Sequence, residues 1–210
     1  MRFPAGSLLI HEGQAALNLY TLLEGWAYRF RTLANGRRQI LDFLLPGDLI
    51  GAQHAVSGNA WHGVRTLTEA TVCVFGHELL SDPAHGVQRL NSDICVLMAH
   101  ECSSLEESLV SLGQRTALER MAALFLVIFR RAAALQTDRG ASGVFFPVTQ
   151  QEIADTLGLS LVHTNKTMRR LEKLTGSSVK RGRLRVEDLG ALSRVANLYS
   201  DGRPIMRPLL

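Results

Sequence analysis

The sequence predicts an α+β fold in three parts: an N-terminal antiparallel β-roll of the jelly-roll kind, one long helix and a C-terminal winged helix-turn-helix. Three observations predict it. The chain up to about residue 75 consists of short apolar or alternating runs separated by glycine. After residue 83 the apolar period changes from two residues to about 3.6. Around residue 149 one helix-start signal is followed by a glycine and a second helix-start signal.

Five runs in the first part of the chain have the composition and alternation of β-strands. They are residues 8–10, 19–23, 26–30, 39–43 and 71–75. Asn35-Gly36, between two of these runs, predicts a hairpin with a type I′ turn, because that turn needs a positive φ at both central residues. Many short strands at near-regular spacing indicate a roll, which we assign to residues 1–90.

An apolar stripe follows the roll. Its members recur at spacings of three, four and seven residues, on one face of a helix over residues 91–113; they are Ile94, Leu97, Met98, Leu105, Leu109 and Leu112. Such a stripe packs either on the roll of its own chain or on the same helix of a second copy. Its length and narrowness favour a homodimer, with this segment as the dimerisation helix. Gly113 and Thr116 predict a hinge, and residues 117–135 a second, apolar helix.

Two helix signals lie close together in the last third of the chain. Thr149 to Glu152 has the pattern of a capping box, and the helix that starts there ends at Gly158, which tolerates the left-handed conformation. Ser160 then caps a second helix over residues 161–174, with Thr164, Met168 and Leu171 on its inner face. Its outward side chains are Val162, His163, Lys166, Arg169 and Arg170. Two short helices joined by a glycine turn predict a helix-turn-helix.

Residues 179–186 alternate basic and apolar side chains around Gly182, which predicts a small hairpin with a cationic rim, the wing. In DNA-binding proteins of this arrangement the second helix enters the major groove, while flanking Lys and Arg contact phosphates. The alternative is an all-helical packing unit whose arginines meet only solvent. The order of capping box, turn glycine and basic wing favours double-stranded DNA binding, and we assign residues 114–210 to this domain.

Charge is distributed unevenly along the chain. Residues 1–110 carry 7 basic and 11 acidic side chains, a formal net charge of −4, whereas residues 111–210 carry 16 and 8, a net charge of +8. A polyanion would bind the second half, although charge alone is equally compatible with a solvated basic surface. No apolar stretch approaches the roughly 20 residues that span a bilayer, so we expect a cytoplasmic protein without a membrane partner.

The order of these parts resembles the Crp/Fnr family of bacterial transcription regulators over nearly the whole chain. The roll segment from Leu19 to Gly51, with its Gly36-Arg37-Arg38 and Pro46-Gly47-Asp48 motifs, is similar to the family's roll signature. Glu119-Arg120-Met121-Ala122 resembles the start of its helix after the hinge, and residues 149–171 its recognition motif. The resemblance implies a homodimer on a two-fold symmetric operator with half-sites about one helical turn apart, and contact with RNA polymerase when the protein activates transcription.

The resemblance also implies which residues meet DNA. The base-reading positions fall on Leu161, Val162, His163 and Lys166, where the family commonly has Arg or Ser, then Glu, then Thr or Ser, and later Arg. Val162 can contact a thymine methyl and His163 a purine edge, so we expect an unusual operator. Asn165 reads adenine or contacts only phosphate or solvent. The full expected set is Thr149, Gln150, Ser160, Leu161, Val162, His163, Asn165, Lys166, Arg169, Arg170, Lys180, Arg181 and Arg183.

The sensor end of the chain departs from the family's cyclic-nucleotide binders. Ala52 stands where the resemblance places a ribose-binding glutamate, and Ala60-Trp61 where it places the Arg-Ser pair for the phosphate. We therefore expect no cyclic AMP binding. An iron–sulfur cluster needs four cysteines and the chain has three, and His77 and Cys73 are expected to pack rather than to bind haem. The expected effector pocket consists of Gly51, Ala52, Gln53, Ala60, Trp61, His62 and Leu105, with Trp61 and His62 lining it or filling the roll.

Two rival functions remain open from the sequence. One is a small-molecule or nucleotide signalling module without productive DNA binding, which predicts stabilisation by a ligand and no salt-dependent DNA affinity. The other is an enzyme of the cupin kind, since a glycine-punctuated roll can hold a metal. It needs two histidines and a carboxylate on neighbouring strands, whereas His54 and His62 fall in a predicted loop. The histidines show no metal-ligand spacing, and we expect no enzyme and no metal site.

Overall fold

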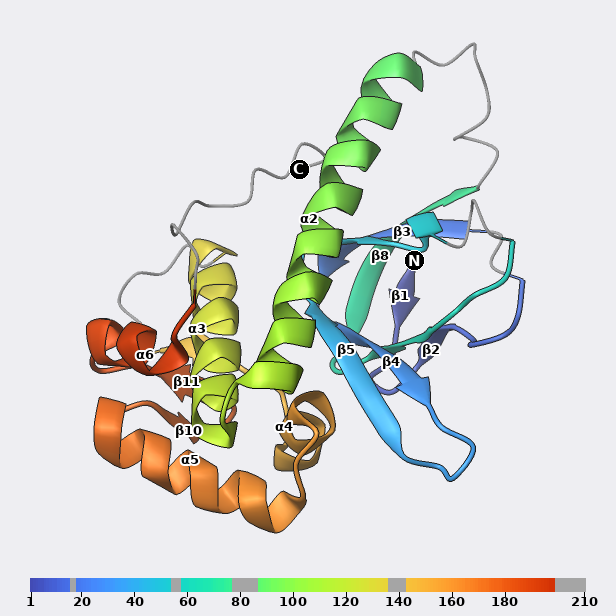
Figure 1. The fold of residues 1–210 in the computed structure, drawn as a ribbon. Helices are drawn as coiled ribbons and strands as arrows, with labels where there is room; N and C mark the ends of the chain where they lie inside the picture. The colour runs from blue at the N-terminus through green and yellow to red at the C-terminus, as the bar shows by residue number, and fades with distance from the viewer. Residues whose placement is uncertain (16–17, 54–57, 77–86, 136–142, 199–210) are drawn as a thin grey trace. The chain divides into compact units, whose positions relative to one another are not determined.

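Figure 1 shows the chain as a computed structural model, which describes residues 1–15, 18–53, 58–76, 87–135 and 143–198. It divides into two compact units, one up to Glu106 and the other from Glu107 onward, and each is treated by itself below. The boundary falls inside the long helix. Within the described ranges no helix is long and apolar enough to cross a membrane.

The described residues of the first unit form eight short strands in two antiparallel sheets. The strands are β1 (Arg2–Phe3), β2 (Leu8–Ile10), β3 (Asn18–Glu24), β4 (Ala27–Thr32), β5 (Arg38–Leu44), β6 (Leu49–Ile50), β7 (Gly63–Thr66) and β8 (Ala70–Gly76). One sheet has the order β1-β8-β3-β6 and the other β2-β7-β4-β5. All five predicted strands are confirmed, as is the antiparallel roll. The prediction did not include the two-residue strands β1 and β6, which are too short to show a periodicity, or the four-residue strand β7.

The apolar faces of the two sheets enclose one core. Its buried members include Leu22 and Val72 from the first sheet, and Ala27, Leu44 and Val64 from the second. In a strand every second side chain faces the same side, so the inward positions of β4 include Ala27 and Arg29. The side of β4 that faces the core therefore carries a charged side chain, that of Arg29.

The hairpin between β4 and β5 is confirmed, but its predicted turn type is wrong. Gly36 has φ +80°, whereas Asn35 keeps a negative φ, so only one of the two positive angles of a type I′ turn is present. The Gly36 N–H donates to the Leu33 carbonyl (2.8 Å), and the Leu33 N–H donates to the Arg37 carbonyl (2.8 Å). This is a three-residue loop in which a type I turn is followed by a left-handed glycine.

The long helix, α2 (Val87–Gln114), begins four residues earlier than predicted. Its last residues, from Glu107, belong to the second unit. At the expected hinge near Gly113 and Thr116 the chain turns from α2 into α3, and the buried Arg115 guanidinium there pairs with Glu107 and donates to the Asn197 carbonyl (2.9 Å). These contacts tie the end of α2 to the end of the chain's last helix.

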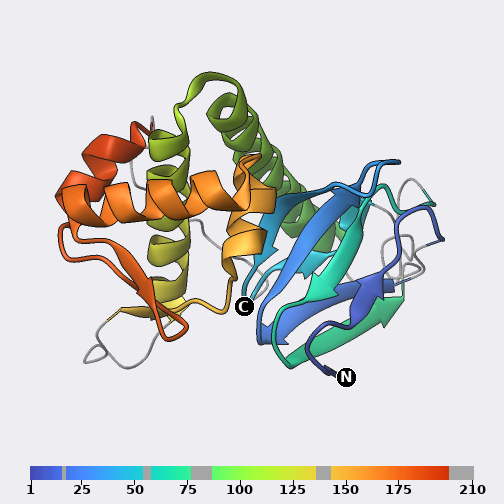
Figure 2. The same cartoon turned by 90° about the horizontal axis from the view of Figure 1, so that it is seen from below.

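The second unit is arranged around α3 (Ala117–Leu135), as Figure 2 shows. The other elements are β9 (Val144–Phe145), α4 (Gln150–Leu157), α5 (Leu161–Thr175), β10 (Ser178–Lys180), β11 (Arg183–Arg185) and α6 (Leu189–Ala196). α3 packs against α4, α5 and α6, and its buried Phe125 meets Phe146 edge-on with ring centroids 5.8 Å apart. The predicted helices are confirmed. The prediction did not include β9, which pairs with β11, or α6.

A second capping box, which was not predicted, starts α3. The Thr116 N–H donates to the Glu119 carboxylate (2.7 Å), and the Glu119 N–H donates to the Thr116 hydroxyl (3.4 Å). The hydrogen bonds from the Thr116 side chain and backbone hold the pKa of Glu119 below its usual value. These hydrogen bonds therefore fix the residue at which α3 begins.

Candidate functional site

The helices α4 and α5 both begin with the predicted caps, and a glycine turn lies between them. The Thr149 hydroxyl accepts from the Glu152 N–H (3.2 Å), and the Glu152 carboxylate accepts from the Thr149 N–H (2.7 Å). Gly158 ends α4 with φ +64°, and the Ser160 hydroxyl accepts from the His163 N–H (3.2 Å). The capping box, the glycine turn and the serine cap are confirmed. The start of α5 is therefore fixed by the Ser160 side-chain cap, two residues after the glycine that ends α4.

One face of α5 is buried and the other is open. The buried residues are Thr164, Thr167, Leu171 and Thr175, while Met168, expected inside, is only half-buried. Thr167, 5% exposed, takes the inner position instead. The outward side chains are exposed as predicted: Leu161, Val162, His163, Lys166, Arg169 and Arg170. Val162 is the most open of them at 80% exposure, and Asn165 is half-buried.

The exposed basic residues of α5 form the surface that we call the α5 basic face: Lys166, Arg169, Arg170 and Lys173. These side chains line two shallow concave areas along the helix. Among the described residues, none of the four has a carboxylate within ion-pair distance. The prediction did not include Lys173, although its spacing of four from Arg169 and seven from Lys166 places it on the same side.

The wing is present, but two of its three predicted cations have partners within the chain. β10 and β11 are joined at Arg181 and Gly182, whose φ angles of +52° and +68° are those of a type I′ turn. Lys180 pairs with Glu172 of α5 (2.6 Å), and Arg183 donates to the Gly143 carbonyl (2.5 Å). Arg181 at the tip is exposed, as is Arg185, which the prediction did not include.

The remaining predicted DNA contacts lie at helix starts. Thr149 and Gln150 are exposed at the start of α4, and Ser160 is exposed at the start of α5. The hydroxyls of Thr149 and Ser160 already accept backbone N–H groups as caps. Free N–H groups and the helix dipole make such positions favourable for phosphate oxygens.

The residues of the predicted effector pocket differ in their exposure. Ala52, Ala60 and His62 are buried, but Trp61 is 65% exposed. Trp61 therefore does not fill the roll, whereas its neighbour His62 is buried. Leu105 of α2 is 36% exposed. Gly51 has φ +95°, and a Cβ there would lie 2.8 Å from the Asn18 carbonyl, so only glycine fits.

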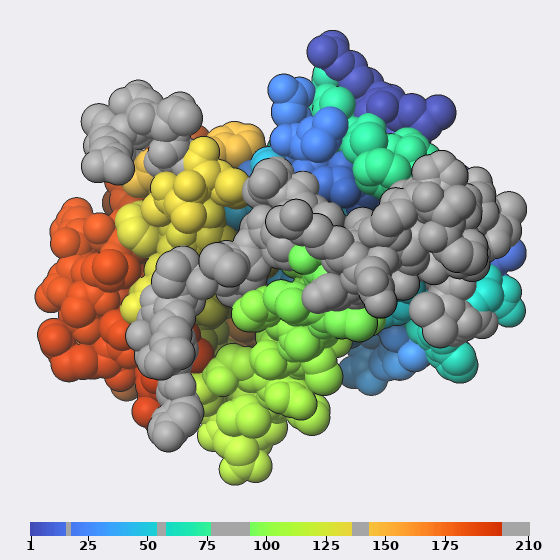
Figure 3. Space-filling model, turned by 90° about the horizontal axis from the view of Figure 1, so that it is seen from above, coloured from blue at the N-terminus to red at the C-terminus, as the bar shows by residue number. Residues whose placement is uncertain are grey.

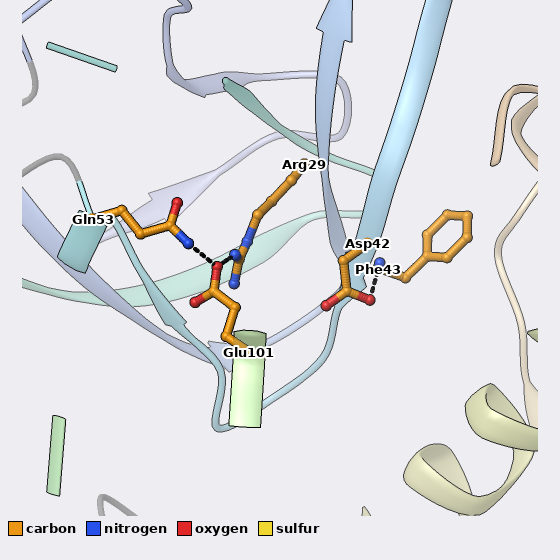
Figure 4. Close-up of polar contacts among 5 residues, drawn as sticks. All are labelled: Arg29, Asp42, Phe43, Gln53 and Glu101. Carbon is orange, nitrogen blue, oxygen red and sulfur yellow. Dashed lines mark hydrogen bonds and ion pairs between the residues drawn. The ribbon is translucent and has the colours of Figure 1, made fainter. Parts of the chain in front are cut away.

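A buried charge cluster occupies the inside of the roll (Figure 4). Arg29 of β4 is 6% exposed and pairs with Glu101 of α2. The Gln53 side-chain amide donates to the same carboxylate oxygen of Glu101. Gln53 was predicted, whereas the other two were not. The signal for Arg29 was its position two residues after Ala27 in an apolar strand, whereas nothing local points to Glu101.

Metal-ligating residues do not gather in the part of the chain that the structure describes. No group of three His, Cys, Asp or Glu side chains is placed to hold an ion there. His54 and His77 lie outside the described residues. Cys73 is half-buried, whereas Cys95 and Cys102 are exposed on α2.

Apolar side chains are exposed along α2, whose light green surface is visible in Figure 3. Val96, Leu109 and Val110 are exposed by 41%, 72% and 50%. The predicted stripe is divided: Leu105 and Leu109 are exposed, whereas Ile94, Leu97, Met98 and Leu112 are half-buried. Among the described residues, nothing covers this exposed part of the helix in the single chain.

The α4–α5 pair, the wing and the basic face after a β-roll define a two-domain DNA-binding protein with a winged helix-turn-helix. The chain matches two family profiles, "Cyclic nucleotide-binding domain" over residues 1–82 and "Crp-like helix-turn-helix domain" over residues 119–195. The chain belongs to the Crp/Fnr family, and it is a transcription regulator rather than an enzyme, as predicted.

Two relatives illustrate the match. The nitrogen fixation regulation protein FixK of Bradyrhizobium diazoefficiens is 30% identical over 201 residues, which cover 93% of this chain and 81% of that protein. The transcriptional activatory protein AadR of Rhodopseudomonas palustris is 31% identical over 181 residues, 82% of this chain and 71% of that protein.

Solved structures confirm the fold. The structure of FixK2 from Bradyrhizobium japonicum has a TM-score of 0.82 at 23% identity, covering 95% of this chain and 98% of that one. A transcriptional regulator of the CRP family from Thermus thermophilus, TTHB099, has a TM-score of 0.73 at 23% identity, covering 99% of both chains.

Proposed function

We propose that the chain acts as a homodimer that binds a two-fold symmetric DNA operator, with one α5 in the major groove of each half-site. The observation that carries the proposal is the α5 basic face, whose cations have no intramolecular carboxylate partner among the described residues. A helix fits the major groove, and lysine and arginine along its side reach the phosphates that border it. Leu161, Val162 and His163, at the first turn of α5, are then the residues closest to base edges.

The wing supports the same arrangement. Arg181 at its tip and Arg185 on β11 are exposed, so they can contact phosphates beside the groove that α5 enters. Lys180 and Arg183 instead hold the wing to α5 and to the carbonyl of Gly143. We therefore assign to DNA the α5 basic face, the first turn of α5, Arg181 and Arg185, and to the scaffold Lys180 and Arg183.

The exposed face of α2 supports a dimer. Positions 95, 98, 102, 105, 109 and 112 alternate spacings of three and four, the heptad pattern of a coiled-coil seam, and four of these residues are exposed: Cys95, Cys102, Leu105 and Leu109. Two α5 helices reach one side of a duplex only if the second units lie at the same end of the helix pair. The two α2 helices would then be parallel, and each seam residue would face its own copy.

Two further parts of the function follow from this proposal. A protein that reads chromosomal DNA in a bacterium works in the cytoplasm. Where it activates transcription it also contacts RNA polymerase, as the family resemblance implies. Both parts depend on operator binding, which is the step to test first.

Selection of bound fragments from a random DNA pool by the purified protein tests the proposal. We expect an enriched motif with two-fold symmetry and half-site centres about 10 base pairs apart. Lys166→Ala should weaken binding to this motif about tenfold or more. Enrichment of no motif at moderate salt, together with stabilisation of the protein by a nucleotide, would instead support a signalling module without DNA binding.

The dimer has its own test, since two cysteines lie on the proposed seam. Mild oxidation should cross-link parallel α2 helices through Cys95 or Cys102, giving a covalent dimer on a non-reducing gel. The Cys95→Ser, Cys102→Ser double variant should remain a monomer on the gel, whereas Cys73→Ser should cross-link normally. A wild-type protein that sediments as a monomer and does not cross-link would contradict the dimer.

A further inference from the structure

Arg29 lies where a charge is costly. It belongs to β4, a central strand of its sheet, and its register partners are Asp42 on β5 and Val64 on β7. It faces the same side as Ala27, a member of the core. Since transfer of a guanidinium from water to such a place is unfavourable, the charge requires a closely placed anion.

The anion comes from a distant part of the same unit. Glu101 lies in the middle of α2, and its carboxylate reaches into the roll to pair with the Arg29 guanidinium. Gln53 donates its amide to that carboxylate, so a second side chain fixes the orientation of Glu101. The Glu101 side chain is 15% exposed, and thus both charges are largely removed from solvent.

A second arginine on the same strand shows what an ordinary surface pair looks like. Arg31 pairs with Glu12 at 3.0 Å, but its side chain is 55% exposed, and neither residue extends to α2. A pair of this kind contributes little to stability because solvent screens it. The Arg29–Glu101 pair differs from this surface pair in three respects: it is buried, Gln53 is its third partner, and it joins the roll to α2.

The cluster shares Gln53 with the expected effector pocket. Gln53 is one of the residues that the family resemblance places next to an effector, and its amide here contacts a side chain of the protein itself. Asp42 is the register partner of Arg29 on β5, so the neighbouring strand carries a second acidic residue next to the pair.

We propose that Glu101 is a built-in anionic ligand of the roll. Its carboxylate fills, from within the chain, the place of a diffusible anionic effector, holds the first part of α2 to the roll, and keeps the regulator competent for DNA without a small molecule. The inference rests on the proposed function for its DNA readout, but the anion site itself can be tested by stability alone.

Chemical rescue of Glu101→Ala tests the proposal. Removal of the carboxylate takes the Glu101 anion from Arg29 and opens a space of about the size of acetate. The melting temperature of the variant should fall by about 5–10 °C, and its operator affinity about tenfold. Acetate or formate at about 100 mM should restore most of both, whereas chloride at the same ionic strength should not.

Two controls accompany the rescue. Glu12→Ala removes the carboxylate of the exposed Arg31 pair, and should change neither property nor respond to acetate. Glu101→Gln keeps the shape of the side chain but removes its charge, and it leaves no empty space for an added anion. Its melting temperature should fall, and acetate should not restore it. This variant remains informative if Glu101→Ala does not fold. The wild-type protein should bind its operator after dialysis against buffer without small molecules.

The outcomes separate this proposal from the proposed function. The proposal of a built-in ligand would be overturned if Glu101→Ala were as stable as the wild-type protein. It would also be overturned if the variant were less stable but responded equally to acetate and to chloride. A wild-type protein that needs an added small molecule for operator binding would overturn it too. If no DNA is bound by any variant, the proposed function fails, and the rescue of melting temperature still decides the role of Glu101.

Discussion

Two arginines of the roll and the exposed cations of α5 have opposite surroundings. In the roll, Arg29 and Arg31 each pair with a glutamate of the same unit. On α5, Lys166, Arg169 and Arg170 are exposed without a carboxylate partner among the described residues. A cation paired within the chain contributes to packing, whereas an unpaired one is available to a polyanion. Whether a basic residue is available to DNA is therefore indicated by the presence or absence of a partner within the chain, and not by its charge alone.

The largest expected effect is on DNA affinity. Combined Lys166→Ala, Arg169→Ala and Arg170→Ala should lower operator affinity about a thousandfold and flatten its dependence on salt, because fewer phosphate contacts release fewer counterions. Fluorescence anisotropy with labelled operator at several salt concentrations measures both. Lys180→Ala, which removes a cation already paired with Glu172, should change affinity less than about threefold. Equal losses in both variants would remove the distinction between paired and unpaired cations.

The next effect is on stability. Arg29→Met leaves Glu101 buried without its partner and should lower the free energy of unfolding by about 3 kcal/mol, whereas Arg31→Met should cost less than about 1 kcal/mol because its pair is exposed. Urea denaturation of the two variants provides the comparison. Similar costs would show that burial of the pair does not matter.

The smallest effect concerns the start of α3. Thr116→Ala removes a cap and should destabilise the protein by about 1 kcal/mol. Since the folded-state pKa of Glu119 is lowered, its contribution is present above the usual pKa of a glutamate and is lost as the pH falls through the folded value. Glu119→Gln should therefore be less stable than wild type at neutral pH and approach it in acid. A difference that does not depend on pH would contradict this.

Local signals were sufficient for much of the fold. The capping box at Thr149, Gly158 and the alternating runs are decided by neighbours in sequence, and their elements are confirmed. The turn chemistry was less predictable. Asn35-Gly36 has the favoured composition but forms a three-residue loop, whereas Arg181-Gly182 forms the type I′ turn although arginine is uncommon at positive φ. Loop length and strand register decided both cases.

The outward face of α5 could be predicted from the helical period of its sequence. The partners of charged side chains that lie far apart in the sequence could not. The pairing of Lys180 with Glu172 depends on where the wing lies against α5, and the contact of Arg183 with Gly143 depends on β9. The pairing of Arg29 with Glu101 joins a strand to a distant helix. The sequence identifies charged side chains, whereas their partners depend on tertiary packing.

Hydroxyl-radical footprinting of the selected operator, with protein dialysed free of small molecules, tests the central claim most directly. We expect two protected patches related by two-fold symmetry, with centres about one helical turn apart, and loss of both patches in the triple variant of the α5 basic face. A single patch, or protection that is lost after dialysis and returns only with an added effector, would contradict it.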